Sequence, residues 1–372
     1  MYTWNKHELL AKKLLAKILK KPEFANHYQL LLNQLNLNDS LFNPEEVMVS
    51  TKQTEIDFYK SFSKFTTGLE YFSEDTYKAM AEIYVMLEDL KCLEKREDLP
   101  HYYLSDKELI EIVREMVKSF HIKEFTETFD KIANPTLHLL NIQKQDLSKT
   151  SGSLEYVGGM TLNDPLFNKS YINVFRTYTI EDVEVLFHEV MHSIFYRLMR
   201  PIYTKQQNNI YLLQELEGQF GSLYTYDYLS QIGFKKEMDL LKKEYINTII
   251  TSSFLFMVNH SLYLTSSNAT YNLEDASSFI NESLKNKIII TKDELPTYLS
   301  FNGLETVTNM ISSLIALEIM DKDITPQEKA QLLFDIKCED SLQLDENLDK
   351  FDVNFKDNNF KVLRKTYKEL HK

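Results

Sequence analysis

The sequence predicts a mainly α-helical fold of two lobes, with a small β hairpin or a pair of edge strands beside one central helix. The 372 residues include only eight Gly and eight Pro. So few chain-breaking residues favour long helices with short connections over a β sandwich with many turns. Apolar residues recur at helical spacing along most of the chain, whereas residues 152–174 are rich in β-favouring residues around Gly158-Gly159.

Local signals indicate where the helices begin and end. Ser105 and Glu108 match a capping box that should open one helix, and Thr179 and Asp182 match a second. The helix that follows Thr179 should end at Pro201. Apolar periodicity places further helices at roughly 73–95, 205–231, 236–265, 273–286, 303–320, 326–337 and 358–371.

The chain is expected to divide into a helical lobe of residues 1–150 and a second helical lobe of residues 151–372. The candidate boundaries are the Asn134-Pro135 step and the polar run 143–153. Hydrophobic residues make up 43% of the sequence, which is typical of a folded protein. The formal net charge of −13 argues against nucleic acid as a partner, because phosphate binding needs a positive surface.

The sequence also bears on membranes and on the cellular compartment. No apolar run approaches the length of a membrane-spanning helix, so stable membrane insertion is not expected. The basic, amphipathic N-terminus is better explained as a surface helix that packs its apolar stripe inward. Cys92 and Cys338 are the only cysteines and form no CxxC pair, which predicts a reducing, cytoplasmic location. The oligomeric state is not indicated.

The segment His188-Glu189-Val190-Met191-His192 lies within the helix expected after Thr179. Histidines four residues apart lie on the same helix face, so both imidazoles can bind one metal ion. Glu189 can accept a proton from water in the open position of a zinc site. From composition, an HExxH pattern arises by chance in about one or two of a hundred such chains. The alternative is a partly buried histidine pair that contacts neighbouring helices.

A zinc site needs a third ligand, and the next predicted helix offers Glu215 and Glu217. These residues are about 200° apart around a helix, so only one of them can face the metal. Glu217 is favoured because it shares the apolar face of the helix, where a carboxylate needs a strong partner. Glu215 remains the alternative, since its face carries small residues that permit close approach of another helix.

Residues 151–230 resemble the thimet oligopeptidase and oligoendopeptidase F family of zinc peptidases. The similarity is carried by SGSLEYVGGM, by SYINVFRTYTIEDVEVLFHEVMHSIF and by the spacing from His192 to Glu217. The resemblance implies one zinc ion held by His188, His192 and Glu217, with Glu189 as general base. It also implies a helical fold with a deep channel, and peptide substrates that pair with a strand at 153–160, including Tyr156, Gly158 and Gly159.

Stabilisation of the tetrahedral intermediate is assigned to two candidates. Tyr298 lies in a segment that resembles the family's C-terminal Tyr-rich motif, and a phenol can donate a hydrogen bond to an oxyanion. His260 is the other candidate, although a lone histidine on an apolar helix is more often a core residue. Arg176 and Arg197 flank the HEVMH helix and can in principle bind a peptide carboxylate, but surface ion pairing is the simpler explanation.

The sequence departs from the family pattern at several positions. Met191 stands where the family has Gly, Phe195 stands where a His is frequent, and no His precedes Tyr298. These departures keep two other functions open. One is a protease or effector of narrow specificity that cuts a single protein, and the other is a non-catalytic helical binding protein on the same scaffold.

Overall fold

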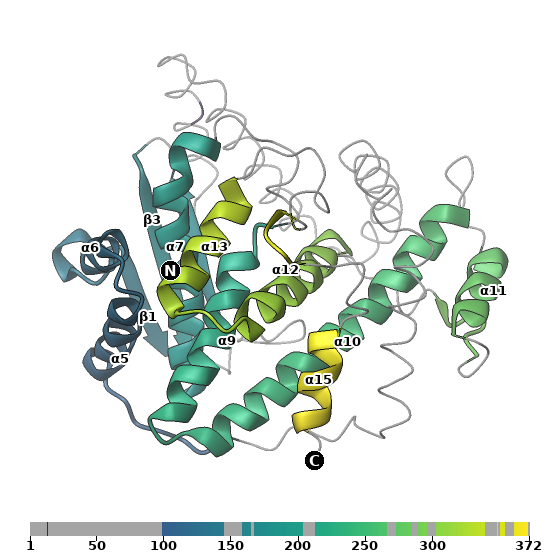
Figure 1. Cartoon of the computed structure of the whole chain (residues 1–372), viewed down its shortest axis with the longest axis horizontal. Coiled ribbons are helices and arrows are strands. Elements are labelled where there is room, and N and C mark those ends of the chain that lie inside the picture. The colour runs from purple at the N-terminus through teal and green to yellow at the C-terminus, as the bar shows by residue number, and fades with distance from the viewer. Residues whose placement is uncertain are drawn as a thin grey trace. The chain divides into compact units, whose positions relative to one another are not determined.

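The computed structural model describes most of the chain from residue 99 onward (Figure 1). The described residues are 13, 99–144, 158–164, 167–203, 213–265, 273–284, 289–295, 303–338, 348, 350–353 and 361–370. Apart from Lys13, the predicted N-terminal surface helix lies outside them, and so does the helix predicted at 73–95. None of the helices in this described part combines the length and apolarity needed to span a membrane.

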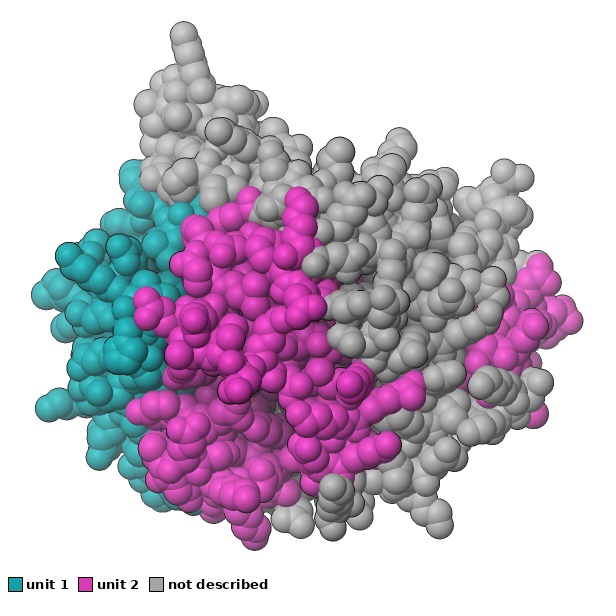
Figure 2. Space-filling model, viewed as in Figure 1, with its two compact units in different colours: residues 1–55, 101–205 teal, residues 56–100, 206–372 magenta. Residues whose placement is uncertain are grey.

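The chain forms two compact units that interleave along the sequence (Figure 2). The first contains residues 1–55 and 101–205, and the second contains residues 56–100 and 206–372. The lobe boundary expected near residue 150 therefore falls inside the first unit. The physical reason is strand pairing, since a strand before this point pairs with one after it.

In the first unit, helices α5 (Asp106–Ser119) and α6 (Lys123–Ile132) pack against each other and against α7 (Glu181–Tyr203). A single 3-10 turn, η2 (Pro135–Leu137), follows α6. The capping box predicted at Ser105 is confirmed. Its hydroxyl accepts a hydrogen bond from the Glu108 N–H at 3.3 Å, and the Glu108 carboxylate accepts one from the Ser105 N–H at 2.7 Å.

The β-favouring segment supplies two strands of a three-stranded sheet, and the third strand comes from residues before it. Strand β2 (Gly159–Asp164) pairs antiparallel with β3 (Lys169–Arg176), which confirms the predicted hairpin. Strand β1 (Leu140–Lys144) pairs parallel with β3 from the other side, giving the order β1-β3-β2. The buried face of β3 packs against α7, and β2 also contacts α7.

The start of α7 is stabilised by Asp182 in a different way from the predicted capping box. The buried Asp182 carboxylate accepts hydrogen bonds from the N–H groups of Thr177 at 2.8 Å and Tyr178 at 3.1 Å. It also accepts one from Arg176 Nε at 3.0 Å. Helix α7 extends to Tyr203, two residues beyond the end predicted at Pro201, which is within the one or two residues to which a helix end is defined.

The described residues of the second unit form helices joined by turns and irregular segments. Helix α12 packs against α9 and α10, and α10 also contacts α11 and α15. The helices are α9 (Leu216–Gln231), α10 (Lys235–Thr265), α11 (Leu273–Ser283), α12 (Gly303–Asp321), α13 (Pro326–Cys338) and α15 (Lys361–Leu370). Each lies where apolar periodicity predicted a helix, although α9 begins later than expected. The mainly helical fold class is therefore confirmed.

Candidate metal centre

Helix α7 contacts different structures on different sides. The Phe187 ring stacks on Phe120 at the end of α5, with ring centroids 6.2 Å apart. Glu189, about 200° further around the helix, contacts β2. His188 and His192 are about 100° and 140° from Phe187, so they occupy the helix face between these two contacts. Both histidines are half-buried.

The two histidines hold their Nε2 atoms 3.1 Å apart, with the rings 4.8 Å apart between centroids. In tetrahedral zinc sites each nitrogen lies about 2.0–2.1 Å from the ion, which places two nitrogens roughly 3.3 Å apart. The observed separation therefore suits two ligands of one zinc ion. It equally suits a hydrogen bond between one protonated and one unprotonated ring nitrogen.

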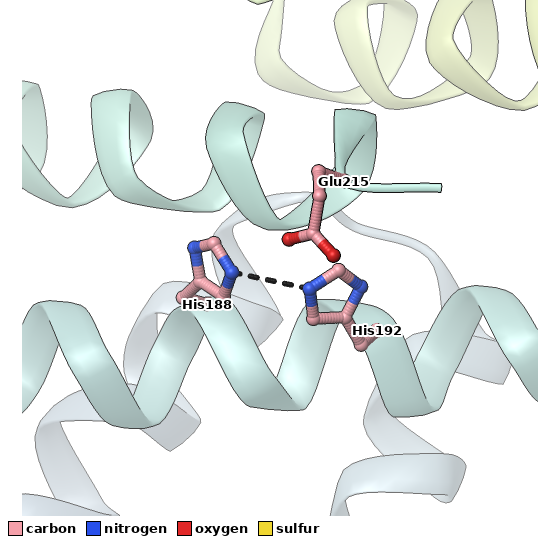
Figure 3. A group of neighbouring side chains, drawn as sticks. All are labelled: His188, His192 and Glu215. Carbon is pink, nitrogen blue, oxygen red and sulfur yellow. Dashed lines mark hydrogen bonds between the residues drawn. The ribbon is translucent and has the colours of Figure 1, made fainter. Parts of the chain in front are cut away.

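Glu215 supplies a third potential ligand. It is the N-cap residue of α9, where it is half-buried and its side chain makes no capping hydrogen bond. One ligand atom from each of His188, His192 and Glu215 lies within 4.8 Å of the other two (Figure 3). Two imidazoles and one carboxylate form a donor set that zinc accepts readily, with a fourth position left for water. The residues therefore fit the implied metal.

Glu217, the glutamate favoured by the sequence, has a different partner. Its face of α9 is buried as predicted, and Glu217 itself is 3% exposed. Its carboxylate forms an ion pair with the Lys337 ammonium of α13, which is also 3% exposed. The argument that a carboxylate on this face needs a strong cationic partner holds. The cation beside Glu217 is the Lys337 side chain rather than a metal ion. The carboxylate that lies near His188 and His192 is that of Glu215.

Glu189 lies against the edge of the sheet and is 7% exposed. The Thr161 hydroxyl lies 2.7 Å from the carboxylate oxygen Oε2 of Glu189 and 3.0 Å from its backbone carbonyl oxygen. Gly159 of the same strand approaches the Glu189 side chain closely, because a Cβ added there would lie 2.4 Å from Cγ. The candidate base is therefore held by two residues of β2.

The remaining sequence candidates are only partly described. Tyr156 and Tyr298 lie outside the described residues. His260 lies in α10, and its side chain is outside the described set. Gly158 has φ of +152°, and its carbonyl oxygen accepts a hydrogen bond from the Phe175 N–H at 3.0 Å, so the backbone here continues the pairing of β2 with β3.

Arg176 forms ion pairs, but from a buried side chain rather than from the surface position suggested by the sequence. The Arg176 side chain is 2% exposed and pairs with Asp182 and with Asp106, 2.8 Å away, which ties the end of β3 to the starts of α5 and α7. Arg197 is half-buried, and burial lowers the pKa of its guanidinium. A lowered pKa indicates surroundings that are apolar rather than anionic.

Two residues that matter for these carboxylates were missed by sequence reasoning. Lys337 follows Ala330 by seven residues and Leu333 by four, so it lies on the buried face of α13, where a lysine signals a buried counter-ion. Thr161 is two residues beyond Gly159, and strand alternation therefore places both on one face of β2. The sequence places Lys337 on a buried helix face and Thr161 on the same strand face as Gly159. It does not indicate that these residues contact Glu217 and Glu189.

No protein-family model and no curated protein matches the sequence. Solved structures match the fold. A protein from Bacillus anthracis str. Ames assigned to oligoendopeptidase F matches 98% of this chain with a TM-score of 0.51 and 13% identity. A second structure assigned to oligoendopeptidase F matches 91% with a TM-score of 0.56 and 11% identity. PZ peptidase A, solved with an inhibitor, matches 82% with a TM-score of 0.54 and 15% identity.

The chain spans 62%, 68% and 58% of the lengths of these three proteins, respectively. The matches extend over most of this chain. The chain therefore shares the mainly helical fold of these peptidases.

Proposed function

We propose that this chain is a zinc-dependent peptidase that hydrolyses peptide bonds in oligopeptides. The observation that carries the proposal is the group formed by His188, His192 and Glu215, with the buried Glu189 next to the first histidine. The fold shared with oligoendopeptidase F and PZ peptidase A supports a peptidase. The two cysteines and the lack of a CxxC pair suit a reducing, cytoplasmic setting.

The chemistry divides between the metal and the chain's own side chains. Zinc, when bound, supplies Lewis-acid polarisation of a carbonyl and a water of lowered pKa. Glu189 accepts a proton from the attacking water and delivers it to the leaving amine. The burial of Glu189 limits its contact with bulk water.

Strand β2 is the proposed binding site for the substrate backbone. It lies at one edge of the described sheet, with β3 as its neighbour. An extended peptide can add to such an edge through main-chain hydrogen bonds, which tolerate many side-chain sequences. Because Gly158 and Gly159 lead into this strand beside Glu189, the scissile bond would lie close to the proposed base.

The proposal is tested with the full chain loaded with one equivalent of zinc and mixed with a library of short peptides. Mass spectrometry should detect internal cleavage, a chelator should abolish it, and added zinc should restore it. A protein that binds zinc normally and cleaves no peptide would contradict the proposal and favour a binding function. New N-termini in a single cellular protein, without turnover of peptides, would favour the narrow-specificity protease.

The third ligand is tested by comparing Glu215→Gln with Glu217→Gln. We expect Glu215→Gln to lose most zinc at equilibrium, because a neutral amide is a far weaker zinc ligand than a carboxylate. Glu217→Gln should retain stoichiometric zinc, since its carboxylate pairs with Lys337. Metal content after dialysis, measured by mass spectrometry, distinguishes the two. Loss of zinc from Glu217→Gln alone would reverse the assignment.

A further inference from the structure

We infer that Thr161 and Gly159 of β2 are positioning residues that orient the Glu189 carboxylate for proton transfer. The inference rests on the proposed function and assigns roles to two residues of the strand. Thr161 contributes a hydroxyl donor, and Gly159 contributes the space that the Glu189 side chain occupies. Neither residue would contact the metal or the reacting atoms.

The register of β2 against β3 places Gly159 and Thr161 on the face of the sheet that packs against α7. Gly159 and Thr161 are two positions apart and so lie on the same face of β2. Their partners on β3 are Val174 and Ile172, which are fully buried, and β3 packs against α7. The face of the sheet that covers α7 therefore carries a gap at Gly159 and a hydroxyl at Thr161, directly beside Glu189.

The Thr161 hydroxyl gives the carboxylate a defined orientation. At 2.7 Å, Oγ1 lies at the ordinary distance for a hydrogen bond from a hydroxyl to a carboxylate oxygen. The bond anchors Oε2 and leaves Oε1 as the oxygen that we assign to proton transfer. The same hydroxyl lies 3.0 Å from the Glu189 carbonyl oxygen, so the threonine is linked to both the backbone and the side chain of one residue.

Gly159 allows the strand to lie this close. A Cβ at this position would lie 2.4 Å from Cγ, 2.9 Å from Cδ and 2.9 Å from Oε1 of Glu189. Any side chain would push the base away from its position, because the backbone of β2 is held by its pairing with β3. The need for glycine here comes from this close approach rather than from an unusual backbone conformation.

The test compares Thr161→Val, Thr161→Ser and Gly159→Ala in the full zinc-loaded chain, with a peptide cleaved by the wild type as substrate. We expect Thr161→Val to lower kcat about 10- to 100-fold with KM within about twofold, because a misplaced base affects the chemical step. Thr161→Ser should restore kcat to within about threefold. Gly159→Ala should lower kcat by about 100-fold, with zinc content unchanged in all three.

Thr248→Val is the matched control, because that exposed hydroxyl of α10 also donates to a backbone carbonyl, at 3.0 Å. It should leave kcat unchanged. In a Glu189→Gln background, Thr161→Val should reduce kcat no further. The metal-free proteins give a readout independent of activity. The shifts in thermal unfolding midpoint caused by Thr161→Val and Glu189→Gln should not add, since one removes the donor of a hydrogen bond and the other makes the acceptor of the same bond neutral.

The outcomes separate this inference from the proposed function. A wild-type chain that cleaves nothing overturns the proposed function and this inference with it. An active wild type whose Thr161→Val variant keeps full kcat overturns the inference alone. So does a Thr161→Val loss that persists undiminished in the Glu189→Gln background, or a Thr161→Ser variant as impaired as Thr161→Val.

Discussion

Glu189→Gln is expected to lower kcat for peptide cleavage by about 10²- to 10⁴-fold while the protein keeps its zinc. The substitution preserves the shape of the side chain and the oxygen that can accept the Thr161 hydrogen bond. An amide, however, does not take a proton from water near neutral pH, so the general-base step is lost. KM should change little, because Glu189 acts on the attacking water rather than on the substrate in its ground state.

Glu124→Gln, an exposed position on α6, provides the matched control and should keep full activity. Steady-state kinetics and metal content are measured on the same preparations. A Glu189→Gln variant with unchanged kcat would assign the base to another residue. Loss of zinc from this variant would instead make Glu189 a metal ligand, in conflict with its contacts to β2.

Lys337→Met is expected to lower the free energy of unfolding by about 3–5 kcal/mol. The substitution leaves the Glu217 carboxylate buried between α9 and α13 without its ammonium partner. Removing one member of a buried ion pair is costly because the remaining charge stays desolvated with nothing to compensate it. Urea unfolding followed by circular dichroism measures the change, and the midpoint should fall while the slope stays constant.

Two further variants isolate the cause. Combining Lys337→Met with Glu217→Leu removes both charges and should recover most of the lost stability, because apolar replacements of a whole buried pair are often neutral or stabilising. Lys292→Met breaks an exposed ion pair with Glu274, whose atoms are 3.7 Å apart, and should change stability by less than about 1 kcal/mol. A Lys337→Met variant as stable as the Lys292→Met variant would show that the buried pair contributes little.

The helices were predictable from the sequence because their signals are local. The apolar stripes that become α10, α12 and α13 repeat every three or four residues, and few Gly or Pro residues interrupt them. The capping box at Ser105 involves residues only three positions apart. Strand β1 was missed for the opposite reason. It is only five residues long and runs into the polar stretch at 143–153, and its pairing with β3 joins residues about thirty positions apart.

The sequence by itself determined the pair of histidines, because residues four apart on a helix face the same way whatever surrounds them. It also determined that Glu217 faces the core. Only the tertiary structure decided which carboxylate approaches the histidines, since Lys337 lies 120 positions beyond Glu217 and neutralises its charge. The contact of Thr161 and Gly159 with Glu189 was likewise decided by packing. Local geometry is encoded within a few residues, whereas the choice of a counter-ion depends on which distant side chains are brought into contact.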